Sequence, residues 1–407
     1  MGLRRPFRHL RPEGWLRLVF LALAVLYSIL TIWTALHIGL FTVLGGDFRA
    51  FFAAAHIAVT SGFAQVYNLA VQKEVQGELM APYTDGEVET VPVPFFPPFI
   101  LPFVIFLPLG LSRGFALWTI LNVIALAVYV SRFVGKSTEG NFLLVTTFLS
   151  FPVFLNFFFG QVNVWLLICV GEFLRAWEGG RPFRGGLWLG GLLMKPQTLI
   201  LVLPFLALSG EWGILLGFAA ASIVVGTMSL ILGGPEGLKA WGILLFRYTG
   251  NLPTTSPQAM VNLRMLGEVL SVLFPPAPMR GIAAGLSVGL ALVMLWLFFR
   301  RSKRMPEDRA GPLLSLLAAT SAVTWHSHIH MAAMLIPPFL RQVSTGQMPR
   351  RLFVLWTVLP PAVYFWSMVG MALLSALDRP ISPFPGFTYP ALVLLIFHIY
   401  LAIRGIR

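Results

Sequence analysis

The chain has 407 residues, of which 57% are hydrophobic and only 11% are charged, and its formal net charge is +13. A soluble domain carries about 25% charged residues, so the composition excludes an ordinary globular protein, a disordered chain and a soluble nucleic-acid binder. The single cysteine, Cys169, lies in an apolar run and rules out a disulfide framework. Walker and GxGxxG nucleotide motifs are absent from the sequence. We therefore expect an all-α polytopic membrane protein.

The first apolar run, residues 18–44, continues for 27 residues without a charge, and a spanning helix needs about 20. It lacks the short core and the small-residue cleavage site of a secretory signal peptide. Its N-terminal flank is basic, with Arg4, Arg5, Arg8, Arg11 and Arg17. Because Lys and Arg concentrate on the cytoplasmic side of a membrane, we expect a permanent helix with a cytoplasmic N-terminus.

The later apolar runs differ in length, and polar breaks divide the longest of them. The runs are 95–111, 114–131, 141–171, 185–209, 212–232, 281–299, 311–340, 352–377 and 387–403. The breaks are Gly160-Gln161, Lys195-Pro196 and the segment from Trp325 to His328. Basic residues flank the first and third of these divided runs on both sides, which predicts hairpins whose tips reach the outer face.

Residues 95–111 contain four prolines and decide the orientation of everything that follows. If this segment only dips in from the outer face, 20 of the 29 Lys and Arg residues are cytoplasmic, against 12 if it spans the membrane. The first count obeys the positive-inside rule, so we expect a re-entrant or outer-leaflet element, covered by protein or a water-filled cavity. The outcome is about 12 transmembrane helices in one domain, 1–407. We expect both termini to be cytoplasmic and the membrane to be the plasma (inner) membrane.

Two larger outer loops emerge, about 45–113 and 233–280. Apolar residues at helical spacing from Phe48 to Val59, ended by Gly62, predict a juxtamembrane helix in the interface. The following stretch, 70–92, carries six charged residues and is expected to be a solvated loop.

Scarce polar residues gather at the outer level of these spans. They are Asp47, Gln161, Asn163, Lys195, Asn262, Arg264, His326, His328 and His330. A polar group near the apolar zone is a functional hypothesis by default. One carboxylate among a few cations and amides favours acid–base chemistry on a substrate that carries phosphate.

Each of these residues also has a structural interpretation. Asp47 has the side chain of a good helix N-cap, and Lys195 has the length to snorkel to water. Gln161 and Asn163 are suited to stabilising a hairpin.

The histidine run also suggests a metal site, but on a helix His328 would point away from His326 and His330, which leaves two ligands on one face. Glu172 lies three residues before Arg175, which predicts a local ion pair outside the site.

Motifs in a fixed order along the chain carry a family resemblance. They are Gly46-Asp47-Phe48, Phe96-Pro97-Pro98, Gly160-Gln161-Val162-Asn163, Lys195-Pro196, Asn262-Leu263-Arg264 and Ser321 to His328. Between about residue 45 and residue 340 the chain resembles glycosyltransferase family 87 of the GT-C superfamily. The Gly-Gln-x-Asn hairpin followed by the Lys-Pro hairpin is the most specific part of the resemblance.

The resemblance implies an inverting glycosyltransferase with a GT-C-type fold. It would transfer a sugar, mannose in typical members, from a polyprenyl-phosphate donor to a glycolipid or glycan acceptor at the outer face. Asp47 would be the general base, while Lys195, Arg264 and His326 or His328 would neutralise the donor phosphate. Gln161, Asn163, Asn262 and Trp325 would bind substrate. Neither a metal nor another cofactor is expected, and the bilayer is the remaining partner.

Departures from the family pattern occur in two places. Ala322 and Thr324 replace a proline and a serine, and Ser327 falls at one of the family's histidine positions, which leaves His326 and His328 as alternatives. In the second loop, Arg264 stands where a small polar residue is common. The main alternative function is a lipid-carrier flippase or small-solute transporter, and a membrane scaffold is the third. Transporters tend to show repeated halves with polar groups at the midplane, and the sequence has neither feature.

Overall fold

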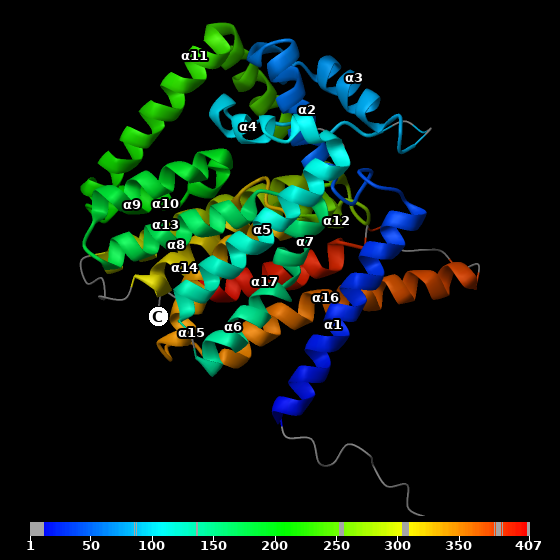
Figure 1. The fold of residues 1–407 in the computed structure, drawn as a ribbon. Coiled ribbons are helices and arrows are strands. Elements are labelled where there is room, and N and C mark those ends of the chain that lie inside the picture. The colour runs from blue at the N-terminus through cyan, green and yellow to red at the C-terminus, as the bar shows by residue number, and fades with distance from the viewer. Residues whose placement is uncertain are drawn as a thin grey trace, which may run out of the picture.

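The structure is a computed structural model that describes residues 12–404 except 85, 87, 136, 252–255, 303–308, 378, 380–383 and 385. The described residues form helices and contain no strands, only two isolated bridges, Leu40 with Leu44 and Met260 with His328. The predicted all-α fold is confirmed (Figure 1).

Five helical stretches among the described residues are long and apolar enough to cross a membrane. They are α1 (Pro12–His37), 97–134, α11 (Trp212–Asn251), α13 (Pro276–Ser302) and α16 (Arg350–Ala376). A sixth is present if α6 (Thr138–Phe148) and α7 (Phe151–Phe159), which are bent by 52°, form one span. The shorter apolar helices α14 (Ala310–Val323) and α17 (Thr388–Arg404) fall below that length. The count of about 12 spans therefore stays a prediction.

The three predicted breaks in the long apolar runs are confirmed. The first separates α7 from α8 (Asn163–Glu178), and the second, at Lys195, separates the 3-10 turns η3 (Gly190–Met194) and η4 (Pro196–Leu199). The third separates α14 from η7 (Ile329–Leu335). Gly160 has φ 74°, which favours glycine, and Pro196 has no N–H to continue a helix.

Residues 95–111 are broken as their prolines predict. They form α4 (Pro97–Val104) and η2 (Leu107–Leu109) before α5 (Gly110–Val134) begins. In Figure 1, α4 lies beside α2 (Gly46–Thr60) at the top, and α5 descends from it. The break keeps α4 off the line of α5, and the re-entrant position stays a prediction.

The predicted helix after residue 47 is confirmed as α2, but it is enclosed by protein on more than one face. Phe48, Arg49 and Ile57 are each at most 1% exposed, and α2 packs against α4, η1 (Phe63–Tyr67) and α3 (Leu69–Met80). Protein therefore covers more of α2 than the apolar face that the sequence predicted, and its position in the interface stays a prediction.

The expected solvated loop at 70–92 is also wrong, because α3 occupies its first half. The Asn68 side chain caps this helix by accepting a hydrogen bond from the backbone N–H of Ala70. Gln72 and Gln76 of α3 are buried and hydrogen-bond backbone groups of other segments. Hydropathy does not detect a helix that buries amides in place of apolar groups.

Segments assigned to the cytoplasm lie together at one end of the bundle. Arg175 pairs with Glu172 at 3.1 Å, as predicted, and also donates to the backbone oxygen of Arg132 at the end of α5. Arg309 pairs with Glu211 at 3.6 Å. In Figure 1, α6 and α15 (Ile336–Ser344) lie at the lower left, away from α2, α3 and α4.

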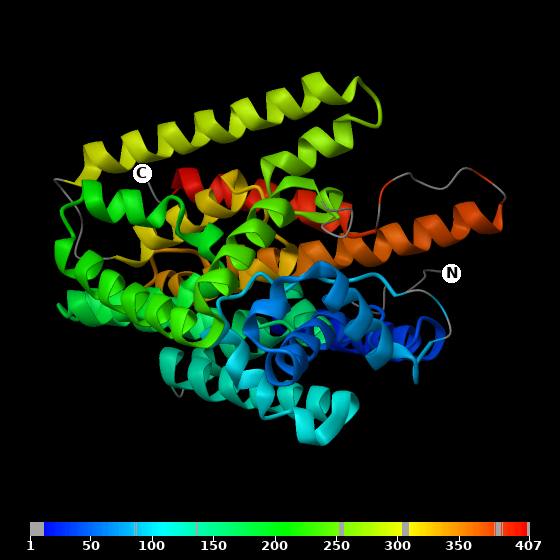
Figure 2. The same cartoon turned by 90° about the horizontal axis from the view of Figure 1, so that it is seen from above.

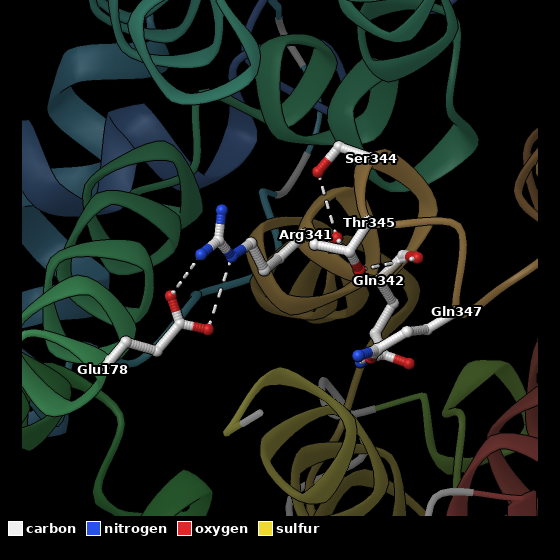
Figure 3. A network of polar contacts seen from close by, with 6 residues as sticks. All are labelled: Glu178, Arg341, Gln342, Ser344, Thr345 and Gln347. Atoms are coloured by element: carbon white, nitrogen blue, oxygen red, sulfur yellow. Dashed lines mark hydrogen bonds and ion pairs between the residues drawn. The ribbon is translucent and has the colours of Figure 1, made fainter. Parts of the chain in front are cut away.

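Figure 3 shows the ion pair that joins α15 to the end of α8. Arg341 contacts Glu178 with two nitrogens, Nη2 to Oε2 at 3.1 Å and Nε to Oε1 at 3.4 Å. The hydroxyls of Ser344 and Thr345 donate to the backbone oxygen of Arg341, at 3.0 and 2.9 Å. A largely exposed ion pair of this kind adds little stability. It does show that α15 and the end of α8, which both carry basic residues, lie at the same end of the bundle.

Figure 2 shows α13 running along one edge of the molecule. Its outward side chains are large and apolar, among them Leu286, Leu292 and Trp296, each at least 50% exposed. An apolar surface of this size on a helix long enough to span is what a lipid-facing helix presents.

The two faces can be assigned by labelling single cysteines. In a Cys169→Ala background, Lys73→Cys in α3 should react with an impermeant thiol reagent on intact cells. Ser344→Cys in α15 should react only after the membrane is opened. Both positions are exposed, so accessibility does not bias the comparison. Labelling of both from outside, or of Ser344→Cys alone, would overturn the topology.

Candidate active site

A cavity of about 520 Å³ lies where the three breaks meet the first outer loop. Its lining includes seven residues singled out from the sequence, Asp47, Gln161, Lys195, Trp325, His326, His328 and His330. These residues span nearly 300 positions of the chain and come from α2, the 160–163 turn, the Lys195 break and the 324–330 segment. The fold therefore brings together the groups that the sequence only ordered.

Lys195 is held by the neighbouring hairpin. Its Nζ donates to Gln161 Oε1 and to Asn163 Oδ1, each at 3.0 Å, and its side chain is buried. Thr198 fixes the turn by donating its hydroxyl to the Lys195 carbonyl at 2.8 Å. An ammonium buried between two amide oxygens contradicts the snorkelling alternative.

Asp47 is not the N-cap of its helix. Gly45 is the N-cap and makes no side-chain cap, while Asp47 lies in the first turn of α2. The Asp47 carboxylate instead forms a hydrogen bond with the Gln161 side chain. Since Gln161 Oε1 accepts from Lys195, its amide group is the donor to Asp47. Gln161 thus links the Asp47 carboxylate to the Lys195 ammonium.

Burial shifts both charged groups toward neutrality. It raises the pKa of Asp47, against the opposing effects of the Gln161 hydrogen bond, Lys195 and Arg49. It also lowers the pKa of Lys195 to about 7, with Asp47 opposing the shift. Perturbed groups facing a cavity are typical of functional sites, and a carboxylate with a raised pKa is a better proton acceptor.

Two glycines allow α2 to approach the hairpin tip. The Gly45 N–H donates to the Phe158 carbonyl at 2.8 Å, with Gly45 at φ 76°. A Cβ on Gly160 would lie 2.6 Å from the Cβ of Phe48, so only glycine fits. Gly46 lines the cavity, whereas a Cβ on Gly45 would meet the Phe41 ring at 3.0 Å.

The three histidines do not share one helix, because His326 and His328 precede η7 and His330 lies in its first turn, so the helix-based argument about their side-chain directions is wrong. Residues 325–328 lie between α14 and η7, and the three rings follow one another at 4.7 and 5.4 Å between centroids. Burial, followed by the charge of Lys195, lowers the pKa of His328 to about 4. Burial also lowers the pKa of the other two. At neutral pH these rings are uncharged hydrogen-bonding groups.

Asn262 and Arg264 support the histidine segment from outside the cavity lining. Asn262 caps α12 (Leu263–Leu270) by accepting from Met265 N–H, and it donates to the Thr324 carbonyl at 2.8 Å. Arg264 Nη1 donates to the Trp325 carbonyl at 3.2 Å. Among the described residues that line the cavity, neither of the two occurs.

Sequence reasoning missed two charged residues at the site. Arg49 is 1% exposed and donates to the backbone oxygens of Phe41 and Glu89, at 3.1 and 2.8 Å. A lone cation inside the apolar stretch 48–59 was an available signal. Glu89 lines the cavity, and its position in a charged stretch gave no such signal.

Residues 95–322, more than half of the chain, match glycosyltransferase family 87. The chain belongs to glycosyltransferase family 87. No curated protein and no solved structure matches it. Membership establishes a glycosyltransferase in a membrane protein, in agreement with the GT-C placement, in place of a transporter or scaffold.

The family match covers only part of the cavity. Gln161, Asn163 and Lys195 lie inside the matched range, whereas Asp47 and His326 lie outside it. Their inclusion in the candidate site rests on the geometry of the cavity and the hydrogen bond between Asp47 and Gln161.

Asn262→Ala should destabilise the protein because it removes a helix cap and orphans the buried Thr324 carbonyl. The expected loss is about 1–3 kcal/mol, seen as a lower melting temperature in detergent. Asn141→Ala, an exposed asparagine in α6, is the matched control and should melt like the wild type. Equal melting of both variants would remove Asn262 from the support of the histidine segment.

Proposed function

We propose that this family 87 member is an inverting glycosyltransferase that uses a polyprenyl-phosphate sugar, with mannose as the first sugar to test. The acceptor is a glycolipid or glycan at the outer face of the plasma membrane, and the whole chain acts as one catalytic domain. The observation that carries the proposal is the cavity in which Gln161 links the Asp47 carboxylate to the Lys195 ammonium. A base and an anion-binding group side by side are what transfer from a phosphate leaving group requires.

The reaction is a single displacement at the anomeric carbon. The acceptor hydroxyl oxygen bonds to that carbon while the bond from carbon to the phosphate oxygen breaks, so the configuration inverts. Asp47 takes the hydroxyl proton, and the polyprenyl phosphate leaves with the bonding electrons. Burial supports this role because it raises the pKa of Asp47 toward the operating pH.

The leaving phosphate binds at the basic side of the cavity. Lys195 supplies the charge, and the rings of His326 and His328 donate hydrogen bonds as neutral imidazoles. Arg264 adds positive potential from behind Trp325 and positions the segment that carries both histidines. A phosphodiester donor carries one negative charge, so these groups suffice without a metal or cofactor.

The remaining candidates act as positioning and substrate-binding groups. Gln161 and Asn163 hold Lys195 and orient Asp47, while Asn262 fixes the Thr324 carbonyl. Trp325 lines the cavity and is 42% exposed, so its ring is available to cover one face of a sugar. We place this cavity on the extracytoplasmic side, with both termini cytoplasmic, because the basic helix ends gather at the other end.

Asp47→Asn tests the base. Asn keeps the size and the hydrogen-bonding capacity but does not accept the proton, and losing a general base costs about 10²–10⁴ in rate. We expect a folded variant that binds radiolabelled polyprenyl-phosphate mannose normally and transfers the sugar at that reduced rate. Since Asp47 does not cap α2, the melting temperature of the Asp47→Asn variant should stay close to that of the wild type. Turnover within threefold of wild type at equal donor occupancy would exclude Asp47 as the base.

Lys195 should make donor binding depend on pH. With a pKa lowered to about 7, the free ammonium is charged below pH 7 and loses its charge above it. Donor affinity should therefore fall as pH rises through 7, with a limiting slope of about tenfold per pH unit. Lys195→Met should weaken donor binding by about 10–100-fold and remove this pH dependence. Equal affinities and equal pH profiles for both proteins would place the phosphate elsewhere.

A further inference from the structure

An extended segment, residues 88–95, forms one wall of the cavity. Glu89, Val91, Pro92, Pro94 and Phe95 line the space, and no helix runs through this stretch. A wall without secondary structure must satisfy its backbone groups in another way, and here side chains from the surrounding helices do so.

Two buried glutamines of α3 hold the middle of the segment. Gln76 makes a pair of bonds with Val91, donating to its carbonyl at 2.9 Å and accepting from its N–H at 3.0 Å. Gln72 accepts from the Val93 N–H at 3.2 Å. These amides take the place of a neighbouring strand.

Three further side chains hold the ends of the segment. Arg49 of α2 donates to the Glu89 carbonyl at 2.8 Å. Trp241 of α11 donates to the Pro94 carbonyl at 3.0 Å, and Tyr67 of η1 donates to the Phe95 carbonyl at 2.8 Å. Four elements thus fix the backbone of 88–95, so the wall is formed before any ligand arrives.

The charged groups at the cavity interact with one another in pairs. Lys195 interacts with Asp47 and with the histidines, and Asp47 interacts with Arg49. Arg49 in turn interacts with Glu89 through charge as well as through the backbone. Hydrogen bonds place the same groups: Lys195 is held by Gln161 and Asn163 of the hairpin, whereas Arg49, two residues after Asp47 in α2, donates to the Glu89 carbonyl. Glu89 therefore lies on the α2 side of the cavity and the proposed phosphate site on the hairpin side.

An inverting displacement places the acceptor opposite the leaving group. If the phosphate lies at Lys195 and the reacting hydroxyl at Asp47, the body of the acceptor extends toward Glu89 and the 88–95 wall. Glu89 is an exposed carboxylate at that end, and a carboxylate accepts hydrogen bonds but repels a second anion. Val91 and Phe95 offer apolar surface to the C–H face of a sugar ring.

We propose that residues 88–95 form the acceptor subsite and that Glu89 binds hydroxyl groups of a neutral sugar, selecting against an acceptor sugar that carries a carboxylate near the reacting hydroxyl. This inference rests on the proposed function. It assigns Glu89 to substrate binding and leaves the proton transfer to Asp47.

Glu89→Gln separates acceptor binding from chemistry. With radiolabelled polyprenyl-phosphate mannose and glycolipids extracted from membranes, the KM for acceptor should rise about tenfold, because a charge-assisted hydrogen bond becomes a neutral one. The KM for donor and kcat should stay within twofold. Glu78→Gln, an exposed glutamate on α3 away from the cavity lining, is the matched control and should leave all three constants unchanged.

A matched pair of inhibitors tests the class of sugar. Octyl glucoside and octyl glucuronide, each below its micelle concentration, differ by a carboxylate at C6. Wild-type transfer should be inhibited at least tenfold more strongly by the glucoside, competitively with acceptor. The preference should shrink in Glu89→Gln.

Each outcome has a distinct meaning. An unchanged acceptor KM in Glu89→Gln, a fall in kcat alone, or inhibition by the glucuronide or by neither compound would overturn the acceptor subsite. Such results would leave the proposed function standing as long as wild type transfers the sugar and Asp47→Asn does not. Absence of transfer and of donor hydrolysis by wild type with every polyprenyl-phosphate sugar would instead overturn the proposed function.

Discussion

The close approach of α2 to the tip of the α7–α8 hairpin is the contact on which the rest of the site depends. Gly160 allows it because any side chain there would collide with Phe48, and the Gly45 N–H bonds the Phe158 carbonyl across the junction. This contact brings the first turn of α2 against Gln161. The Asp47 carboxylate on α2 and the Lys195 ammonium at the second hairpin then share the amide side chain of Gln161.

Burying an acid and a base together is costly unless their hydrogen bonds are satisfied. The hairpin meets that requirement with amides: Gln161 and Asn163 accept from Lys195, and Gln161 also bonds Asp47. The residual desolvation raises the pKa of Asp47 and lowers that of Lys195. The same burial thus shifts both groups of the pair toward neutrality, which is a property of the tertiary environment and is typical of functional sites.

Around this pair, loops are fixed by side chains in place of regular secondary structure. The 88–95 wall depends on Gln72, Gln76 and Arg49, and the histidine segment depends on Asn262. Buried amides and one buried guanidinium therefore give shape to the two irregular walls of the cavity. In a membrane protein, irregular backbone of this kind is stable only when protein satisfies its polar groups, and these side chains do so.

The sequence alone determined the class of the protein, the positions of its three helix breaks and most of the polar groups facing the cavity, because hydropathy, proline and glycine act locally. Only the tertiary structure decided that Asp47 is no helix cap and that residues 69–80 form α3. It also placed Asn262 and Arg264 behind the histidine segment, outside the cavity lining. It revealed Arg49 as a buried neighbour of both Asp47 and Glu89. The physical reason is that burial and hydrogen-bond partners arise from segments far apart in the chain, and no local pattern records which of them will meet.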